Sequence, residues 1–305
     1  MVKHLGGVWR LTRFGEYASF VVVTTLLGAA AGRGTFGWLL IGVVAANWLA
    51  VGFAFMINDV EDAPDDALDP AKARRNPVSA GLLSPRPARA WSLLVAGLAA
   101  PLYAALGPGP FAAGSACLLL AWMYSWRPIR LKAIPVADLV SHAAMLAGLQ
   151  FLAAYWAFEG GPPGHWVFPL LMVLAISLYG QLFNELRDLD GDLRAGVTHT
   201  ASYFGPHATQ VLMLACLALG VLCAAVTLFV LQLFPAWAVV LMVALAGVLL
   251  WRRRRRGIQA RSTVQLHPAF HKPVEIAAAV ALTAWFAGPA LVRALGRVIS
   301  GSVGL

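Results

Sequence analysis

Nine long apolar segments limit what this chain can fold into more than any other feature of its sequence. They cover residues 15–32, 36–57, 90–107, 110–126, 136–158, 166–186, 208–232, 235–251 and 274–295. A helix of roughly 20 apolar residues spans the hydrocarbon core of a bilayer. Only 12% of the 305 residues are charged, whereas soluble domains average about 25%. The sequence therefore predicts an all-α integral membrane protein, with residues 1–305 forming a single domain of nine transmembrane helices.

The distribution of basic residues predicts how these helices cross the membrane. If the nine segments alternate in direction, all of the 23 Lys and Arg residues except Arg33, Arg293 and Arg297 fall on the side of the N-terminus. Lys and Arg accumulate in cytoplasmic loops, so we expect the N-terminus to face the cytoplasm. Abundant Ala, Gly and Arg suggest a prokaryotic membrane. The arginine run at 252–256 fits contact with anionic lipid, and we expect the bilayer, not nucleic acid, as its partner.

Acidic residues concentrate in two short stretches, each at the cytoplasmic end of an apolar segment. Ten of the 14 Asp and Glu residues lie in residues 58–69 and 184–192. The two stretches share a spacing of four residues, with Asn58, Asp62 and Asp66 in the first and Asn184, Asp188 and Asp192 in the second. Residues four apart lie on one face of a helix. Each stretch is therefore expected to form an oxygen-rich stripe.

Two facing acidic stripes repel each other unless cations lie between them. Mg²⁺ prefers oxygen ligands and typically binds through a few carboxylates together with substrate phosphates. Basic residues that can contact phosphate follow the first stripe and fill the next cytoplasmic loop; they are Lys72, Arg74, Arg75, Arg127, Arg130 and Lys132. The pattern favours a metal site that binds a phosphate-bearing substrate. Alternatives are a solvated acidic surface, a structural Ca²⁺ site or a cation transporter, although transporter acids usually lie near the bilayer midplane.

Several motifs in the chain resemble those of the UbiA-type intramembrane prenyltransferase superfamily. "NDVEDAPDD" fits the NDxxDxxxD pattern through Asn58, Asp59, Asp62 and Asp66, and "DLDGD" fits the second motif, DxxxD, through Asp188 and Asp192. "RNPVSAGLLS" at 75–84, "YSWRPIRLK" at 124–132 and "DLRAGVTHT" at 192–200 are similar to further stretches of the family. The resemblance covers about residues 9–295, and the nine-helix count matches.

The resemblance implies a function and a set of site residues. Such enzymes bind a polyprenyl diphosphate through two Mg²⁺ ions and transfer the prenyl group to a lipophilic or aromatic acceptor, in a lipid-accessible chamber with the active site at the cytoplasmic side. The implied metal ligands are Asp59, Asp62, Asp66, Asp188 and Asp192. Asn58 and Asn184 would orient the metals or the diphosphate, and catalysis would depend most on Asn58, Asp62, Asn184, Asp188 and Lys132. Implied diphosphate contacts are Arg75 and Lys132, and in second place Lys72, Arg74, Tyr124 and Arg130.

Two questions stay open at this point. Pro64 lies inside the first motif and can end a helix or start a new one, so Asp65 or Asp69 could reach the metal in place of Asp66, which we favour. The function also has alternatives. Within the resemblance these are a terpene cyclase that uses the same metal site without an acceptor, and a relative that transfers phosphoribosyl to a lipid phosphate. Outside it, the alternative is the transporter.

Overall fold

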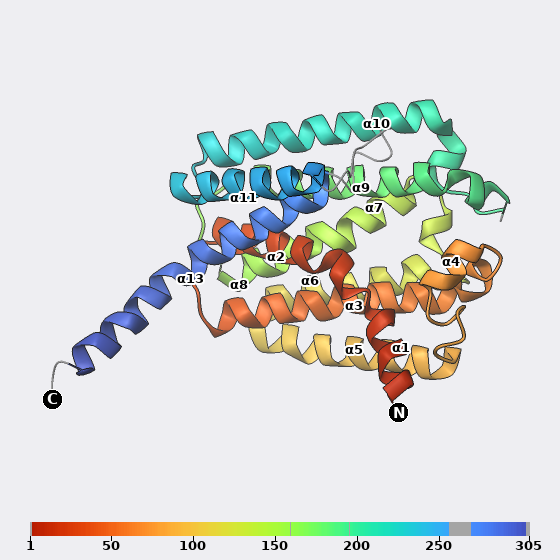
Figure 1. The fold of residues 1–305 in the computed structure, drawn as a ribbon, viewed down its shortest axis with the longest axis horizontal. Coiled ribbons are helices and arrows are strands. Elements are labelled where there is room, and N and C mark those ends of the chain that lie inside the picture. The colour runs from red at the N-terminus through yellow and green to blue at the C-terminus, as the bar shows by residue number, and fades with distance from the viewer. Residues whose placement is uncertain (1, 159, 195, 256–269, 303–305) are drawn as a thin grey trace.

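The protein is a bundle of helices, seen in a computed structural model that describes residues 2–158, 160–194, 196–255 and 270–302 (Figure 1). The described part contains no strand. Its helices are α1 (Val2–Thr12), α2 (Phe14–Ala31), α3 (Trp38–Asp66), α4 (Pro70–Arg75), α5 (Pro85–Leu106), α6 (Pro108–Ser125), α7 (Ala137–Ala143), α8 (Leu149–Phe158), α9 (Val167–Arg194), α10 (Thr200–Ala225), α11 (Ala236–Arg255) and α13 (Lys272–Ser302). Short π-helical turns at Ala144–Gly148 and Val226–Val230 continue α7 into α8 and extend α10. The arginine run that starts at Arg252 continues into the undescribed residues.

Each of the nine apolar segments corresponds to a helix, which confirms the predicted all-α membrane fold. Eight helices of the described chain are long and apolar enough to cross a membrane. The ninth predicted span is α6, whose first turn contains Pro108, Gly109 and Pro110 and is less apolar. α6 still packs against α3, α5 and α8 inside the bundle. The number of sufficiently apolar helices is therefore eight and not nine because of the composition of α6, although the helix itself is present.

Small residues allow the helices to pack closely. Gly28 on α2 faces α8 so tightly that a Cβ added there would lie 2.3 Å from the carbonyl oxygen of Phe151. Gly114 on α6 packs against the Tyr103 ring of α5, where an added Cβ would lie 2.2 Å from the nearest ring atom. Small side chains at crossings let neighbouring backbones approach, which is how membrane helices gain packing energy in the absence of a strong hydrophobic drive.

Buried polar side chains link helices in the membrane-spanning part. Asn47 on α3 donates to Thr25 Oγ1 of α2 at 2.8 Å and to the carbonyl of Gln150 on α8 at 3.1 Å. The Tyr103 hydroxyl of α5 donates to Asn47 Oδ1 at 2.6 Å. Because lipid offers no hydrogen-bond partners, such groups must be satisfied inside the protein. Asn47 thus links α2, α5 and α8 to α3, the helix that carries the first acidic motif.

Helix α3 runs through Pro64 and ends at Asp66. Pro64 is exposed and lies in the last turn, so its missing N–H removes only one intrahelical bond near the helix end. The break that we considered at Pro64 therefore occurs later. Asp69 caps the next helix by accepting from the N–H groups of Ala71 at 2.7 Å and Lys72 at 3.2 Å, and α4 begins with proline at its first position, a favoured arrangement.

The two acidic motifs lie at the same end of the bundle. In Figure 1 the C-terminal end of α3, the short α4 and the C-terminal end of α9 lie together on the right of the view. The first turn of α10 follows α9 at this end. Both helices continue well past their predicted apolar ends, α3 to Asp66 and α9 to Arg194. Both motifs therefore lie within helices, the first in α3 and the second in α9.

Candidate active site

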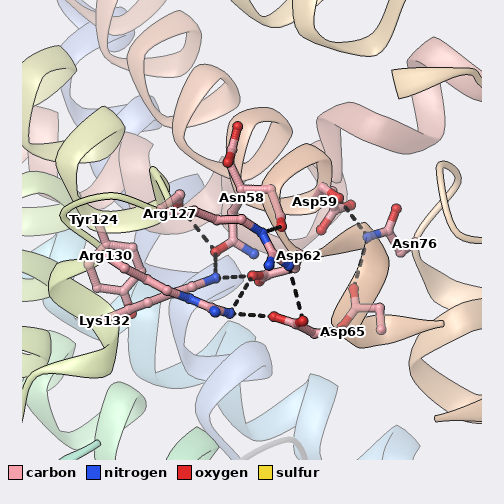
Figure 2. A network of polar contacts seen from close by, with 12 residues as sticks. Asn58, Asp59, Asp62, Asp65, Asn76, Tyr124, Arg127, Arg130 and Lys132 are labelled. Carbon is pink, nitrogen blue, oxygen red and sulfur yellow. Dashed lines mark hydrogen bonds and ion pairs between the residues drawn. The ribbon is translucent and has the colours of Figure 1, made fainter. Parts of the chain in front are cut away.

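Asp62 lies at the centre of a network of polar contacts around the first motif (Figure 2). Lys132 donates to Asp62 Oδ1 and also to Asn58 Oδ1, the latter at 2.9 Å. Arg130 Nη2 lies 3.4 Å from the same Asp62 oxygen and 2.5 Å from Asp65 Oδ2. The structure thus brings together the motif-one residues Asn58 and Asp62 and the two predicted phosphate contacts that follow α6.

The loop between α6 and α7 is shaped to aim these cations at α3. Arg130 adopts a left-handed backbone conformation with φ 47° and is followed by a 3₁₀ turn, Leu131–Ala133, that contains Lys132. A third cation of this loop, Arg127, donates to the Glu61 carbonyl at 3.1 Å and to Asp65 Oδ1 at 3.0 Å. Asp65 is therefore occupied by two arginines on the side of α3 that faces this loop.

Asp59 lies deep in the protein, with only 3% of its surface exposed. Its Oδ1 accepts from Arg13 Nη1 at 3.2 Å, while its Oδ2 is buried and has no hydrogen-bond partner among the described residues. Leaving a buried polar group unpaired is costly. A divalent cation would satisfy this oxygen, so the unpaired atom fits a metal ligand. Arg13, which joins α1 to α2, was not identified from the sequence.

Asn76 fixes the end of α3 after the helix stops. Its Nδ2 donates to the Asp59 carbonyl at 2.7 Å and to Asp66 Oδ2 at 2.8 Å. Its own Oδ1 accepts from the N–H of Val78 at 2.9 Å. Because Asn76 is almost fully buried, it holds Asp66 apart from Asp65, which faces the arginines. This arrangement fits the preference for Asp66 over Asp65 as a ligand, and the role itself remains a prediction.

The second motif lies on the last three turns of α9. Asp188 makes a double contact with Arg187, Nε to Oδ1 at 2.8 Å and Nη2 to Oδ2 at 2.7 Å. Asn184 is half-buried one turn before it. Asp192 Oδ1 accepts from Lys72 Nζ of α4 at 2.6 Å. Partial burial alone would lower the pKa of Lys72, but the hydrogen bond and charge of Asp192 outweigh it and raise that pKa. Lys72 therefore links the segment after motif one to motif two.

A buried cluster that the sequence did not reveal lies behind the second motif. Carboxylate oxygens of Asp138 and Glu185 and a ring nitrogen of His199 all lie within 4.8 Å of one another. Asp138 accepts from the N–H of Thr200 at 2.6 Å and from its hydroxyl at 2.5 Å. Glu185 accepts from Gln181 Nε2 at 2.9 Å and from the N–H of Ala201 at 3.0 Å. Because protein donors already hold these oxygens, the cluster joins α7, α9 and α10 as a structural unit.

His199 connects this cluster to the second motif. Its Nδ1 lies 3.4 Å from Glu185 Oε2 and its Nε2 lies 3.4 Å from Asp192 Oδ2. Burial alone would lower the pKa of the imidazole, but the contacts with Asp192 and Glu185 outweigh this and raise it to about 9. The spacing of seven residues between Asp192 and His199 is the only sequence signal of this contact.

The other predicted phosphate contacts have different partners. Arg75 Nη2 pairs with Glu16 Oε2 of α2 at 2.6 Å. The Arg74 side chain is exposed, and its carbonyl accepts from Arg10 at 2.8 Å. The Tyr124 hydroxyl accepts from Gln181 Nε2 at 3.3 Å. Of the predicted cations, Lys132 and Arg130 thus contact motif one and Lys72 contacts motif two.

Comparison with known proteins identifies the class that this bundle and its paired motifs define. The sequence model of the UbiA prenyltransferase family matches residues 21–272. The chain therefore belongs to the UbiA prenyltransferase family, which confirms the resemblance seen in its motifs.

Individual relatives extend this picture. The chain is 30% identical over 203 residues to the digeranylgeranylglyceryl phosphate synthase of Methanopyrus kandleri, covering 66% of this chain and 70% of the relative. It is 28% identical over 173 residues to the 33 kDa chain of bacteriochlorophyll synthase from Cereibacter sphaeroides, where the match spans 55% of each chain. A UbiA homolog from Archaeoglobus fulgidus, solved with GPP and Mg²⁺, shares the fold with a TM-score of 0.70 and 20% identity, over 92% of this chain and 98% of that one.

Proposed function

We propose that this protein is an integral membrane prenyltransferase. It would transfer a prenyl group from a polyprenyl diphosphate to a lipophilic or aromatic acceptor, in a Mg²⁺-dependent reaction. The observation that carries the proposal is the convergence of the two acidic motifs, linked by the Lys72–Asp192 ion pair, with Asp62 surrounded by cations at the same end of the bundle. Family membership supports prenyl transfer as the reaction class.

The two motifs supply an oxygen-rich donor set that suits Mg²⁺. The residues that would hold it, as two ions, are Asp59, Asp62, Asp66, Asp188 and Asp192. When bound, Mg²⁺ would stabilise the negative charge that develops on the departing diphosphate. The unpaired buried oxygen of Asp59 fits this role. The homologous structure from Archaeoglobus fulgidus was solved with this metal.

The cations of the site have roles that their positions suggest. Lys132 and Arg130 lie against Asp62 and would bind the diphosphate, Lys132 as a compact point charge and Arg130 through its planar fork. Asn58, which already accepts from Lys132, would orient it, and Asn184 would do the same on α9. Ionisation leaves an allylic cation that water would quench, so the apolar helices around the site would exclude water.

The proposal also includes the orientation of the protein in the membrane and its organisation as a single domain. The excess of basic residues on one side supports an orientation in which the N-terminus and the active site would face the cytoplasm. Residues 1–305 would act as one domain, with a chamber open to lipid through which the prenyl chain enters. The acceptor is not fixed by the relatives, because their names describe different lipid products.

Product analysis tests the proposal directly. The purified protein, in lipid nanodiscs with Mg²⁺, is given a panel of prenyl diphosphates with and without phenolic, quinol-type and glycerol-phosphate acceptors, and products are identified by mass spectrometry. We expect prenylated acceptor and diphosphate in equal amounts, both abolished by chelation of the metal. Cyclised hydrocarbon formed without acceptor would instead identify a terpene cyclase, and no diphosphate release from any substrate would contradict both.

A further inference from the structure

We propose that His199 is a positioning residue that holds the Asp192 carboxylate in place for metal binding, through a Glu185–His199–Asp192 clamp. The inference rests on the proposed function, since it assumes that Asp192 is a metal ligand. It assigns a role to a residue that lies outside both acidic motifs. The imidazole would not contact substrate and would act through Asp192 alone.

The clamp follows from the register of α9. Glu185 and Asp192 are seven residues apart, so they lie on the same face of the helix two turns from each other. The His199 ring lies between them, with one nitrogen 3.4 Å from each carboxylate. Only 4% of its surface is exposed. A single buried side chain from α10 therefore spans the two turns of α9 that contain the second motif.

The position of Asp192 explains why it needs such support. It lies two residues before the end of α9 and directly after Gly191. Glycine weakens a helix, and the last turn lacks partners for its carbonyl groups and carries partial negative charge that disfavours an acid. Without an external contact, the Asp192 side chain would be free to adopt several rotamers. His199 approaches one oxygen, while Lys72 bonds the other.

The base of the clamp is itself rigid. The N–H of His199 donates to Ser202 Oγ at 2.8 Å, within the cap of α10. The next two residues bond the buried acids, Thr200 to Asp138 and Ala201 to Glu185. The N–H of Ser202 also lies 3.4 Å from His199 Nδ1, but it can donate there only to a neutral ring. The clamp rests on position: each ring nitrogen lies 3.4 Å from one carboxylate, and Nε2 has no hydrogen-bond partner among the described residues, which leaves its polar edge directed only at Asp192.

Groups that orient metal ligands in this way have a known effect. Hydrogen-bond partners behind metal-binding side chains fix ligand orientation, and their loss typically costs about 10- to 100-fold in metal affinity. Removal of His199 should therefore weaken metal binding while leaving the chemical step intact once metal saturates the site. A residue that served only to cap α10 would affect stability without changing the metal requirement.

Four variants separate these roles. His199→Gln retains a donor close to the position of Nε2 and so keeps the contact with Asp192, whereas His199→Asn retains one near Nδ1 and keeps only the contact with Glu185. His199→Ala removes both. Ser202→Ala is the matched control, because it removes the cap partner and leaves the imidazole in place.

Two measurements apply to each variant. One is Mn²⁺ binding, followed by the electron paramagnetic resonance signal of free Mn²⁺ in the presence of an inert S-thiolo analogue of a prenyl diphosphate. The other is the Mg²⁺ concentration that gives half-maximal diphosphate release. We expect His199→Ala to weaken Mn²⁺ binding and to raise the Mg²⁺ requirement about 10- to 100-fold, with the rate at saturating Mg²⁺ close to that of the wild type. His199→Gln should be less affected than His199→Asn, and Ser202→Ala should match the wild type in both.

Three results would overturn the clamp: an unchanged metal requirement in His199→Ala, equal shifts in His199→Ala and Ser202→Ala, or equal behaviour of the Gln and Asn variants. A lost rate at saturating metal would instead assign His199 to the chemical step. If His199→Ala does not fold, the metal requirements of His199→Gln and His199→Asn are compared instead, and a smaller change in His199→Gln supports the clamp. Failure of the proposed function is distinguishable, since the wild type would then release no diphosphate while the Mn²⁺ comparison still reports on the clamp.

Discussion

Lys72 Nζ lies 2.6 Å from Asp192 Oδ1, an ion pair between residues 120 positions apart in the chain. The pair connects α4, which follows the first acidic motif, to the end of α9, which carries the second. Both side chains are partly exposed, with 33% and 19% of their surfaces accessible. Such a pair stabilises a protein by at most about 1 kcal/mol. Its importance is therefore positional, because it occupies an oxygen that the metal would need.

If Lys72 and metal compete for the Asp192 carboxylate, replacement of Lys72 should change the stability of the protein mainly when no metal is bound. Lys72→Met should lower the melting temperature of the protein in chelator, because Asp192 loses one of its two cationic neighbours. The difference from the wild type should shrink when Mg²⁺ and an inert prenyl diphosphate analogue are added, since metal then neutralises Asp192. Lys72→Arg serves as the control that keeps the charge. If Lys72→Met lowers the melting temperature by the same amount with and without metal, Lys72 and metal do not compete for Asp192.

Loss of one central carboxylate in either motif should abolish turnover. Asp62→Asn and Asp188→Asn each remove a charge from the donor set and should reduce diphosphate release more than tenfold, a barrier increase above about 1.4 kcal/mol. Asp190→Asn is the matched control, because Asp190 is an exposed acid between the two motif-two aspartates. Rates are measured on variants with a wild-type gel-filtration profile. A motif variant that retains more than about a tenth of the rate would not be a principal ligand.

The contact of Lys132 with Asp62 and Asn58 predicts a role in diphosphate binding. Lys132→Ala should raise KM for the prenyl diphosphate and lower the rate of ionisation. Lys132→Arg should recover part of both, because the charge remains while the shape changes. Steady-state kinetics with varied prenyl diphosphate measure both constants. Arg86→Ala, at an exposed arginine in the first turn of α5, is the control. Equal activity of Lys132, Ala and Arg forms would limit Lys132 to a topological role.

The grouping of the acidic residues could be predicted because their spacing is local. Residues three and four apart share a helix face, so Asn58, Asp62 and Asp66 could be grouped without knowledge of the fold. Lys132, in contrast, was expected near the motif from the resemblance of its loop to the family, because Lys132 and Asp62 are 70 positions apart. The helix ends were misplaced for a physical reason: charged residues end a hydropathic segment, but they do not end a helix, and α3 continues nine residues beyond its predicted end at 57.

Contacts made by helix packing could not be predicted in this way. Arg13 reaches Asp59 across 46 positions, and Thr200 reaches Asp138 across 62. No periodicity in the sequence encodes which faces of α2, α7 and α10 meet α3 and α9. Asn76 was part of a recognised stretch, but its role depends on the turn that brings it back under α3. The supporting residues of the site therefore became visible only with the tertiary structure.

The orientation of the bundle is a separate prediction. The distribution of basic residues predicts that the loop at Ala80 lies in the cytoplasm and the loop at Thr35 on the opposite side. Both residues are exposed. Single cysteines at these positions, in a background without Cys117, Cys216 and Cys223, can be labelled with an impermeant maleimide in intact cells. We expect labelling at position 35 and protection at position 80, and a cysteine at Gly301 should label like position 35. The reverse pattern would invert the topology.

The choice between Asp65 and Asp66 is the sharpest test of the first motif. Helix α3 is unbroken at Pro64, so Asp66 stays in register with Asp59 and Asp62. Asp65 instead pairs with Arg127 and Arg130, and Asn76 holds Asp66 on the other side. We therefore expect Asp66→Asn to raise the Mg²⁺ requirement for diphosphate release strongly. Asp65→Asn should loosen only the loop that carries Arg130.

The two variants form their own control, because each exchanges one carboxylate for an amide at adjacent positions of one helix turn. The measurement is the Mg²⁺ concentration for half-maximal diphosphate release, together with the KM for prenyl diphosphate. Asp65→Asn should change the KM, since Arg130 loses its 2.5 Å partner, and should leave the metal requirement nearly unchanged. A larger metal defect in Asp65→Asn than in Asp66→Asn would mean that α3 rearranges at Pro64 when metal binds, so that the register of the metal-bound site differs from the helical one.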